Sequence, residues 1–213
     1  MKTWLAAIAI AVVLFLVWQY AVSKKKSVDT TLSPASSAAL NDGAYGVDVV
    51  GSRLSWQANK IVGATHSGTV DIKSGELQAQ GGRLQGGSFV LDMTTIKNDE
   101  KIEALLKHLN SADFFDTANF PEAKLSITAV EPGVRVGEYA VKADLTIKGH
   151  TNPIEFTATA GDNDGVLEVA SNFTIDRTKW DIRFGSGKFF DNLGNNLIND
   201  LITFGVSLKA SKK

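Results

Sequence analysis

The 213-residue sequence contains no cysteine. This absence excludes disulfide bonds, cysteine-ligated zinc, iron–sulfur clusters, a thiol nucleophile and a lipid-modified N-terminal cysteine. It does not identify the compartment, because many exported bacterial proteins also lack disulfides. The location and the function of the chain must therefore be inferred from other residues.

An excess of positive charge is also missing. The formal net charge is -1 at pH 7, so the chain lacks the broad positive field that nucleic acid binding uses, and we predict no nucleic-acid partner. Tyrosine is scarce, with 3 residues against 11 phenylalanines. Because phenylalanine has no polar atom, this balance indicates an apolar interior rather than a hydrogen-bonding recognition surface.

Catalytic signatures are lacking as well. The sequence has no phosphate-binding Walker loop, no strand-linked dinucleotide fingerprint, no nucleophile elbow and no acid pair placed with a nucleophile or base. Its histidines, His66, His108 and His150, lie on separate segments without the short spacing of metal ligands. We therefore predict a protein that is not an enzyme and holds no metal. His66 lies in a polar turn that could face a ligand head group or serve the turn itself.

One long apolar run stands at the N-terminus, from Trp4 to about Val22. A run of this length can cross a bilayer core of roughly 30 Å, whereas signal-peptide cores span about 7–15 residues. Residues 1–23 are thus predicted to be an uncleaved signal anchor, with a cleaved signal peptide ending at Ala21-Val22-Ser23 as the alternative. Lys24 to Lys26 follow the run, and the positive-inside rule alone would keep the rest of the chain in the cytoplasm.

The next segment is rich in serine, threonine and alanine, and it contains Pro34 and the turn sequence Asn41-Asp42-Gly43. This composition is typical of a flexible linker, which we assign to residues 24–46. The remaining residues, 47–213, are predicted to form one domain, a common size for an all-β barrel.

Apolar and polar residues alternate through that domain. Tyr139, Val141, Ala143, Leu145 and Ile147, for example, alternate with charged or polar neighbours. Such alternation predicts strands with one buried and one wetted face. Glycine-containing turn sequences separate the segments. About eight strands follow from this pattern, which indicates an antiparallel sandwich or a closed barrel.

One stretch breaks the alternation. From Asn98 to Asn110 the apolar residues Ile102, Leu105, Leu106 and Leu109 have the spacing of an amphipathic helix. Asn98 or Asp99 could cap its start. The helix and the residues after it insert about thirty non-strand residues between two strands. They could form a lid over a barrel mouth or a plug at one end of a packed core.

The domain resembles the YceI-like family of lipid- and polyisoprenoid-binding proteins from about Gly51 to Ala210. The segments that carry the resemblance are His108–Asp116 with Phe120-Pro121, Leu145–Gly149 with Thr151 and Pro153, Phe173–Trp180, and Gly185–Gly194. The resemblance implies an all-β fold: an eight-stranded antiparallel lipocalin-like barrel with a short amphipathic helix insertion, here preceded by the N-terminal transmembrane or signal helix. It also implies a hydrophobic channel and export from the cytoplasm. Together with the N-terminal apolar run, this predicts a periplasmic domain that the N-terminal helix anchors to the inner membrane.

On this basis we predict that the barrel binds, sequesters or transports a long-chain isoprenoid-type lipid. The expected partners are this lipid, which could be quinone-like, and the membrane; no other cofactor is expected. The alternative is a ligand-free structural or stress-related protein-interaction domain with a filled core. The predicted ligand-binding residues are Trp56, His66, Phe89, Met93, Leu105, Leu109, Phe115, Ile127, Leu145, Phe156, Phe173 and Phe204.

Overall fold

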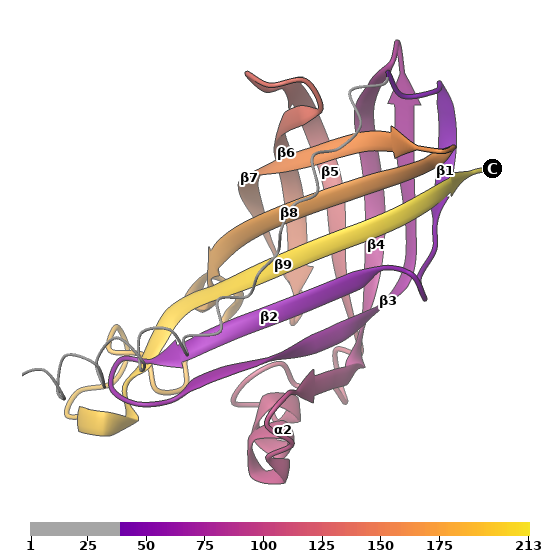
Figure 1. Cartoon of the computed structure of the whole chain (residues 1–213). Helices are drawn as coiled ribbons and strands as arrows, with labels where there is room; N and C mark the ends of the chain where they lie inside the picture. Colours follow the sequence, from indigo (N-terminus) through magenta and orange to yellow (C-terminus); the bar gives the residue numbers. More distant parts are fainter. Residues whose placement is uncertain (1–38) are drawn as a thin grey trace, which may run out of the picture. The chain divides into compact units, whose positions relative to one another are not determined.

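The structure is a computed structural model that describes residues 39–213. In this part of the chain, antiparallel strands form a closed barrel (Figure 1). The strands are β1 (Gly43–Val47), β2 (Arg53–Lys60), β3 (Thr65–Gln80), β4 (Arg83–Asn98), β5 (Glu122–Pro132), β6 (Glu138–Ile147), β7 (His150–Asn163), β8 (Val166–Asp176) and β9 (Ile198–Lys212).

The barrel has eight strand positions. Strands β1 and β2 both pair with β3 on one side and β9 on the other, so they occupy one position in succession. Pairing between β3 and β4 closes the ring. This confirms the eight-stranded antiparallel barrel and excludes the sandwich. Residues 39–213 form the closed ring of pairings and the buried core inside it.

Inward and outward residues alternate as the sequence predicts. In β6, Tyr139, Val141 and Ala143 are buried, whereas Lys142 and Asp144 are exposed. A strand that presents one face to the core and the other to water requires this period of two. The predicted alternation therefore assigns the correct residues to the barrel interior.

The helix starts later than predicted. Helix α2 spans Glu103–Asn110, because β4 continues to Asn98 and the chain then turns with Lys101 at a φ of 55°. The Asn98 side chain holds this turn: its Oδ1 accepts from the Ile102 amide at 2.7 Å, and its Nδ2 donates to the Ile102 carbonyl at 3.1 Å. Asn98 therefore stabilises the approach to the helix and does not cap the helix itself.

The predicted linker also ends earlier than residue 46. Strand β1 begins at Gly43, Leu40 is buried, and the Tyr45 hydroxyl donates to the Asn41 carbonyl at 2.6 Å. The predicted N-terminal helix, residues 1–23, lies outside the described residues. Among residues 39–213, no helix has the length and apolar character needed to span a membrane.

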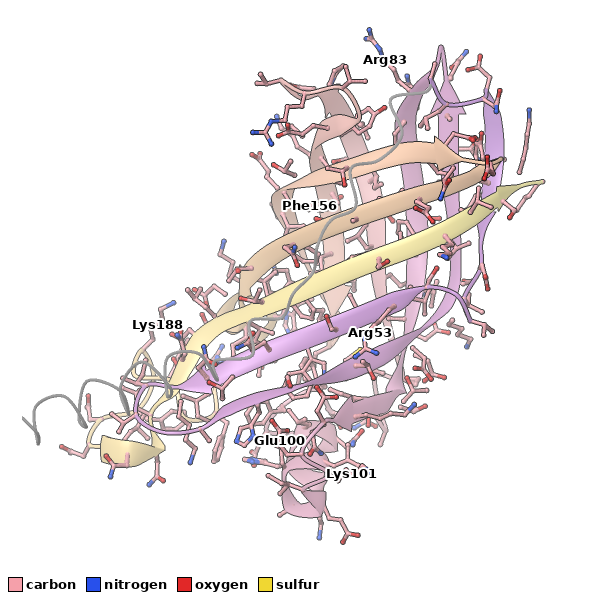
Figure 2. All side chains as sticks on the ribbon, in the orientation of Figure 1. Arg53, Arg83, Glu100, Lys101, Phe156 and Lys188 are labelled. Atoms are coloured by element: carbon pink, nitrogen blue, oxygen red, sulfur yellow. The ribbon has the colours of Figure 1, made fainter. Side chains whose placement is uncertain are left out.

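The barrel has two different ends. The helix end carries the β2–β3 loop, α2 and the residues after it, the β6–β7 turn, and a long segment between β8 and β9 that contains the 3₁₀ turns η1 (Arg177–Trp180) and η2 (Gly194–Asn196). The turn end carries the short β3–β4, β5–β6 and β7–β8 turns. In Figure 2, Lys188 lies at the helix end and Arg83 at the turn end.

Candidate functional site: an apolar cavity in the barrel

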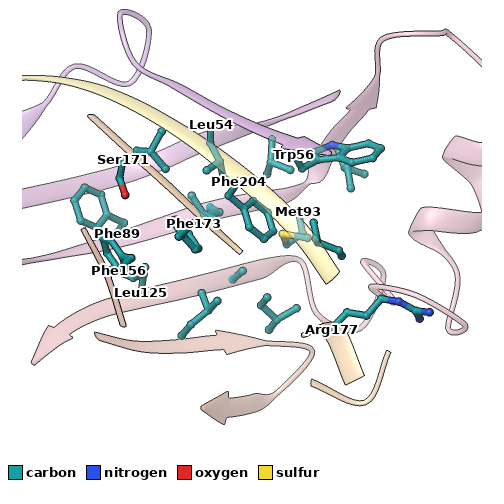
Figure 3. A pocket seen from close by; sticks show the side chains of 18 of the residues that line it. Leu54, Trp56, Phe89, Met93, Leu125, Phe156, Ser171, Phe173, Arg177 and Phe204 are labelled. Carbon is teal, nitrogen blue, oxygen red and sulfur yellow. The ribbon is translucent and has the colours of Figure 1, made fainter. Parts of the chain in front are cut away.

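The inward faces of the strands enclose a cavity of about 140 Å³ (Figure 3). Among its lining residues, Ser171, Arg177 and Asn199 carry polar side chains, and the rest are apolar. The apolar lining residues are Leu54, Trp56, Ala58, Val70, Leu77, Leu84, Phe89, Leu91, Met93, Ile96, Leu109, Phe114, Phe115, Ala123, Leu125, Ile127, Val141, Leu145, Ile147, Phe156, Ala158, Val169, Phe173, Ile198, Ile202, Phe204, Val206 and Leu208.

The barrel interior is not solidly packed. Phe89, Leu125, Phe156, Phe173 and Phe204 point inward and line the cavity, yet each is only half-buried. Protein cores normally pack as densely as organic crystals, so inward side chains that stay accessible mark unfilled space. For scale, an apolar cavity of about 150 Å³ holds one benzene molecule. The space therefore suits a segment of a few carbon atoms, and a longer chain requires inward side chains to move.

Three inward phenylalanines form a stack across neighbouring strands. The Phe156 and Phe173 ring centroids are 4.9 Å apart with an interplanar angle of 25°, and those of Phe173 and Phe204 are 5.4 Å apart at 26°. The rings stack because Phe173 is the direct cross-strand partner of Phe204 and β7 continues the same register. Figure 3 shows this row of three rings among the side chains that line the cavity.

Trp56 continues the row on β2, where it lies opposite Phe204 on one side and Gly68 on the other. Its Nε1 donates to the Lys97 carbonyl at 3.1 Å. A Cβ atom at position 68 would overlap that carbonyl and lie 2.8 Å from the Trp56 ring. Gly68 is therefore the residue that lets the indole lie against β3 and line the cavity.

Arg177 lies at the helix end of the cavity and is 1% exposed. Its guanidinium donates to the carbonyls of Ile182 at 2.8 Å, Asn199 at 3.2 Å and Ile198 at 3.3 Å, and to Asp200 Oδ1 at 3.3 Å. Burial lowers the pKa of Arg177 below its ordinary value, and the nearby Asp200 carboxylate opposes that shift. The guanidinium thus ties the β8–β9 segment to the start of β9.

Two neighbouring residues of opposite charge at the end of β8, Asp176 and Arg177, do not pair with each other. Asp176 binds Lys188 at 2.6 Å, and Arg177 binds Asp200. Lys188 is also 3.5 Å from Asp200. Burial opposes ionisation of Asp176, but the hydrogen bonds from Lys188 and Thr178 outweigh it and lower the pKa of this carboxyl group. These four charged residues form one network at the helix end.

The residues after α2 cover the same end of the cavity. Leu109, Phe114 and Phe115 line it from the predicted insertion. His108 lies behind Phe114, with ring centroids 4.8 Å apart, and Phe184 from the β8–β9 segment lies 4.4 Å from the His108 ring. The insertion thus forms part of the cavity wall at the helix end, where the Phe114, His108 and Phe184 rings pack together.

Most of the predicted ligand-binding residues meet in this cavity. Trp56, Phe89, Met93, Leu109, Phe115, Ile127, Leu145, Phe156, Phe173 and Phe204 all line it. Two predicted residues do not. Leu105 is half-buried and packs against the core one helical turn before Leu109, but it does not line the cavity. His66 lies near the start of β3, with its Nδ1 3.8 Å from Glu100 Oε1.

Sequence reasoning missed other lining residues in two ways. Leu54, Leu125 and Val206 belong to the alternating pattern and could have been selected by it. Arg177 and Asn199 could not, because a charged or amide side chain near the end of a strand predicts a solvent position. Within residues 39–213, no group of three or more histidine, aspartate or glutamate side chains is arranged to hold a metal ion.

The fold and the cavity define a class of protein: a closed antiparallel barrel of eight strand positions around an apolar internal cavity. The YceI-like domain matches residues 45–210, and the chain belongs to this family. The match spans the barrel from β1 into β9.

Curated relatives match a shorter stretch. A UPF0312 protein of Pseudomonas putida (strain W619) is 29% identical over 118 residues, which are 54% of this chain and 60% of the relative. A UPF0312 protein of Vibrio cholerae is 29% identical over 122 residues, which are 56% and 64% of the two chains. The chain thus matches less than two thirds of the length of these relatives.

Solved structures show the same fold. BcnA of Burkholderia cenocepacia superposes with a TM-score of 0.64 at 19% identity, over 78% of this chain and 99% of that chain. A polyisoprenoid binding domain from Saccharophagus degradans, implicated in plant cell wall breakdown, superposes with a TM-score of 0.62 at 17% identity. The match covers 79% of this chain and 98% of that chain. At such identities the likeness establishes the barrel architecture.

Proposed function

We propose that this protein binds a long-chain isoprenoid-type lipid in its barrel cavity and sequesters or transports it outside the cytoplasm. The observation that carries the proposal is the cavity itself, whose inward phenylalanines are only half-buried and whose wall is almost wholly apolar. An apolar wall stabilises a bound hydrocarbon ligand by about 0.8 kcal/mol for each CH₂ group that the ligand buries. It provides few hydrogen-bond partners for a polar ligand. The polyisoprenoid binding domain that shares the fold supports the same ligand class.

No catalytic step is part of this function. Two buried polar residues at the cavity are committed to structure: Arg177 uses its donors on backbone carbonyls and Asp200, and the Ser171 hydroxyl donates to the Thr157 carbonyl at 2.7 Å. Periplasmic placement and a membrane anchor at residues 1–23 complete the proposal. They are supported by the N-terminal apolar run and the family resemblance, and a periplasm-only reporter enzyme fused to the C-terminus tests them. A silent reporter would contradict the placement.

Lipid binding is tested by filling the cavity. Val206 lines it and is half-buried, so Val206→Phe places an aromatic ring in the free space. The matched control is Ser207→Phe, because the adjacent residue points outward and is exposed. Each gently purified protein is extracted and analysed by mass spectrometry, then offered a polyprenol. We expect the wild type and Ser207→Phe to carry or accept the lipid and Val206→Phe to lose most of it.

Two results would reject lipid binding. The first is that the wild type neither carries nor takes up any long-chain lipid. The second is that the two variants retain equal amounts of lipid, since the bound molecule would then lie outside the barrel. A folded far-ultraviolet circular dichroism spectrum for both variants excludes misfolding as the cause of the loss.

A further inference from the structure

Apolar side chains are exposed on two neighbouring loops at the helix end. In the β2–β3 loop, Ile61 is 57% exposed and Val62 is 63% exposed. In the β8–β9 segment, Phe184, Phe189 and Phe190 are 40%, 44% and 49% exposed. We call these five residues the apolar rim. Several large apolar side chains exposed together mark an interaction surface.

The two loops that carry the rim lie side by side. The Ile61 amide donates to the Leu197 carbonyl at 3.1 Å, and Lys60 is the cross-strand partner of Ile198. Figure 1 shows the β2–β3 loop beside the segment that leads into β9. The Ile198 amide also donates to the Gly185 carbonyl at 2.8 Å, so the two loops of the rim meet at the start of β9 on the helix end.

The rim is continuous with the cavity. Phe184 belongs to the rim, and its ring centroid lies 5.9 Å from that of Phe114, which lines the cavity. His108 packs edge-on against both rings. A hydrocarbon chain that moved between the rim and the cavity would thus contact these aromatic rings, and it would pass the Arg177 guanidinium, which lies 5.9 Å from the Phe114 ring centroid.

The charges near the rim are largely paired with each other. Lys188 binds Asp176 and Asp200, and the Arg183 guanidinium binds Asp181 at 2.6 Å while lying 4.8 Å from the Phe189 ring centroid. Among the described residues next to the rim, Lys60 and Asp191 belong to no ion pair, and because their charges are opposite the rim has no excess of positive charge to attract an anionic partner. The rim therefore favours an apolar medium over an acidic protein or an anionic head group.

We propose that the apolar rim inserts into a lipid bilayer, so that the helix end of the cavity faces the hydrocarbon in which a long apolar ligand dissolves. The role in ligand exchange rests on the proposed function, whereas the insertion itself does not. The residues between the predicted N-terminal anchor and the barrel can span at most about 60 Å, at roughly 3.3 Å per residue. Either end of the barrel can therefore reach the membrane.

Site-specific labels test which end touches the bilayer. Because the chain contains no cysteine, single substitutions allow clean labelling. Ala64→Cys and Asp191→Cys place an environment-sensitive fluorophore beside the rim without removing a rim residue, and Arg135→Cys places it between the exposed Val134 and Val136 at the turn end. The full chain is reconstituted into phosphatidylcholine vesicles. We expect blue-shifted emission and quenching by brominated lipid at 64 and 191, and a water-like signal at 135.

Other signals would overturn the proposal: a water-like environment at 64 and 191, or lipid quenching at 135. A blue shift that grows with protein concentration without vesicles would assign the rim to a second copy of the chain and would also overturn it. Lipid quenching at 64 and 191 in a protein that binds no isoprenoid would leave the insertion standing and reject the proposed function.

A second measurement uses the barrel without the N-terminal run. Residues 39–213 are sedimented with phosphatidylcholine vesicles as the wild type, as Phe189→Ser/Phe190→Ser, and as the control Val134→Ser/Val136→Ser. Since burying one phenylalanine favours binding by at least about 1.5 kcal/mol, the rim variant should partition at least about tenfold more weakly. The control variant should partition onto the vesicles as strongly as the wild type does. Added salt should change the partitioning of neither protein. Equal partitioning of both variants would contradict insertion through the rim.

Discussion

Removal of the Arg177 guanidinium should destabilise the barrel strongly. In Arg177→Met the carbonyls of Ile182, Ile198 and Asn199 lose their donor, and Asp200 loses its buried cation. Breaking a buried ion pair from one side costs about 3–5 kcal/mol. Because Asp200 is 17% exposed and keeps Lys188 at 3.5 Å, we expect the lower limit, about 3 kcal/mol.

The loss of unfolding free energy in Arg177→Met can be measured by urea unfolding of residues 39–213, monitored by tryptophan fluorescence. We expect a lower urea midpoint and an unchanged m-value. Arg183→Met is the matched control, because Arg183 is exposed and paired with Asp181, and such surface pairs contribute at most about 1 kcal/mol. Arg177→Lys should lie between the two, since an ammonium group cannot reproduce the guanidinium fork. Equal midpoints for Arg177→Met and Arg183→Met would refute the structural role assigned to Arg177.

Three further perturbations follow from the site. Phe173→Ala should enlarge the cavity and lower the unfolding free energy by about 2 kcal/mol, which is less than the loss of a fully buried phenylalanine would cost. In the control Thr174→Ala, whose side chain points outward, the unfolding free energy measured with urea should stay within about 0.5 kcal/mol of the wild-type value. Gly68→Ala should displace the Trp56 indole, seen as altered tryptophan fluorescence and a lower melting temperature; an unchanged spectrum would contradict the overlap. Asp176 has a lowered pKa in the fold, so its stabilisation is present above pH 4 and is lost as the pH falls through the folded value. The wild type should therefore lose more stability than Asp176→Asn between pH 5 and pH 2, and parallel pH profiles would reject this linkage.

The barrel could be predicted from the sequence because one rule governs most of it. Each strand must bury one face, so the alternation in β6 or β9 assigns the inward residues directly. Most of the residues that this alternation selected, from Trp56 to Phe204, line one cavity in the structure. Closure into a barrel did not follow from alternation, which a sandwich would share; it came from the resemblance to the YceI-like family.

What the sequence did not predict depends on contacts between distant residues. Helix α2 begins at Glu103 because the Asn98 side chain binds the Ile102 backbone, a geometry that the apolar stripe does not encode. Arg177 pairs with Asp200 rather than its neighbour Asp176, because the β8–β9 segment folds back on the start of β9. His66 was considered for its residue type; it is the cross-strand partner of Ala58, which lines the cavity, but the His66 side chain itself does not line it.

The size of the cavity predicts how affinity should depend on ligand length. One isoprene unit, with about five carbons, would gain about 4 kcal/mol from burial, which corresponds to only millimolar binding. Longer chains need space that the Phe156–Phe173–Phe204 stack occupies. Separating each stacked pair costs about 1 kcal/mol, and two more buried CH₂ groups offset that cost.

The barrel should therefore open for long chains rather than exclude them. Dissociation constants for prenols of two, three and four isoprene units, measured by quenching of tryptophan fluorescence, should fall by at least about tenfold per added unit, because each unit adds more than the 1.4 kcal/mol that a tenfold change requires. The series should level off once the barrel is filled. In Phe173→Ala the stack is already broken, so the gain between two and three units should be larger than in the wild type. If affinity is the same for all three prenols, the stack is a rigid part of the core, and the cavity accepts no more than a single unit.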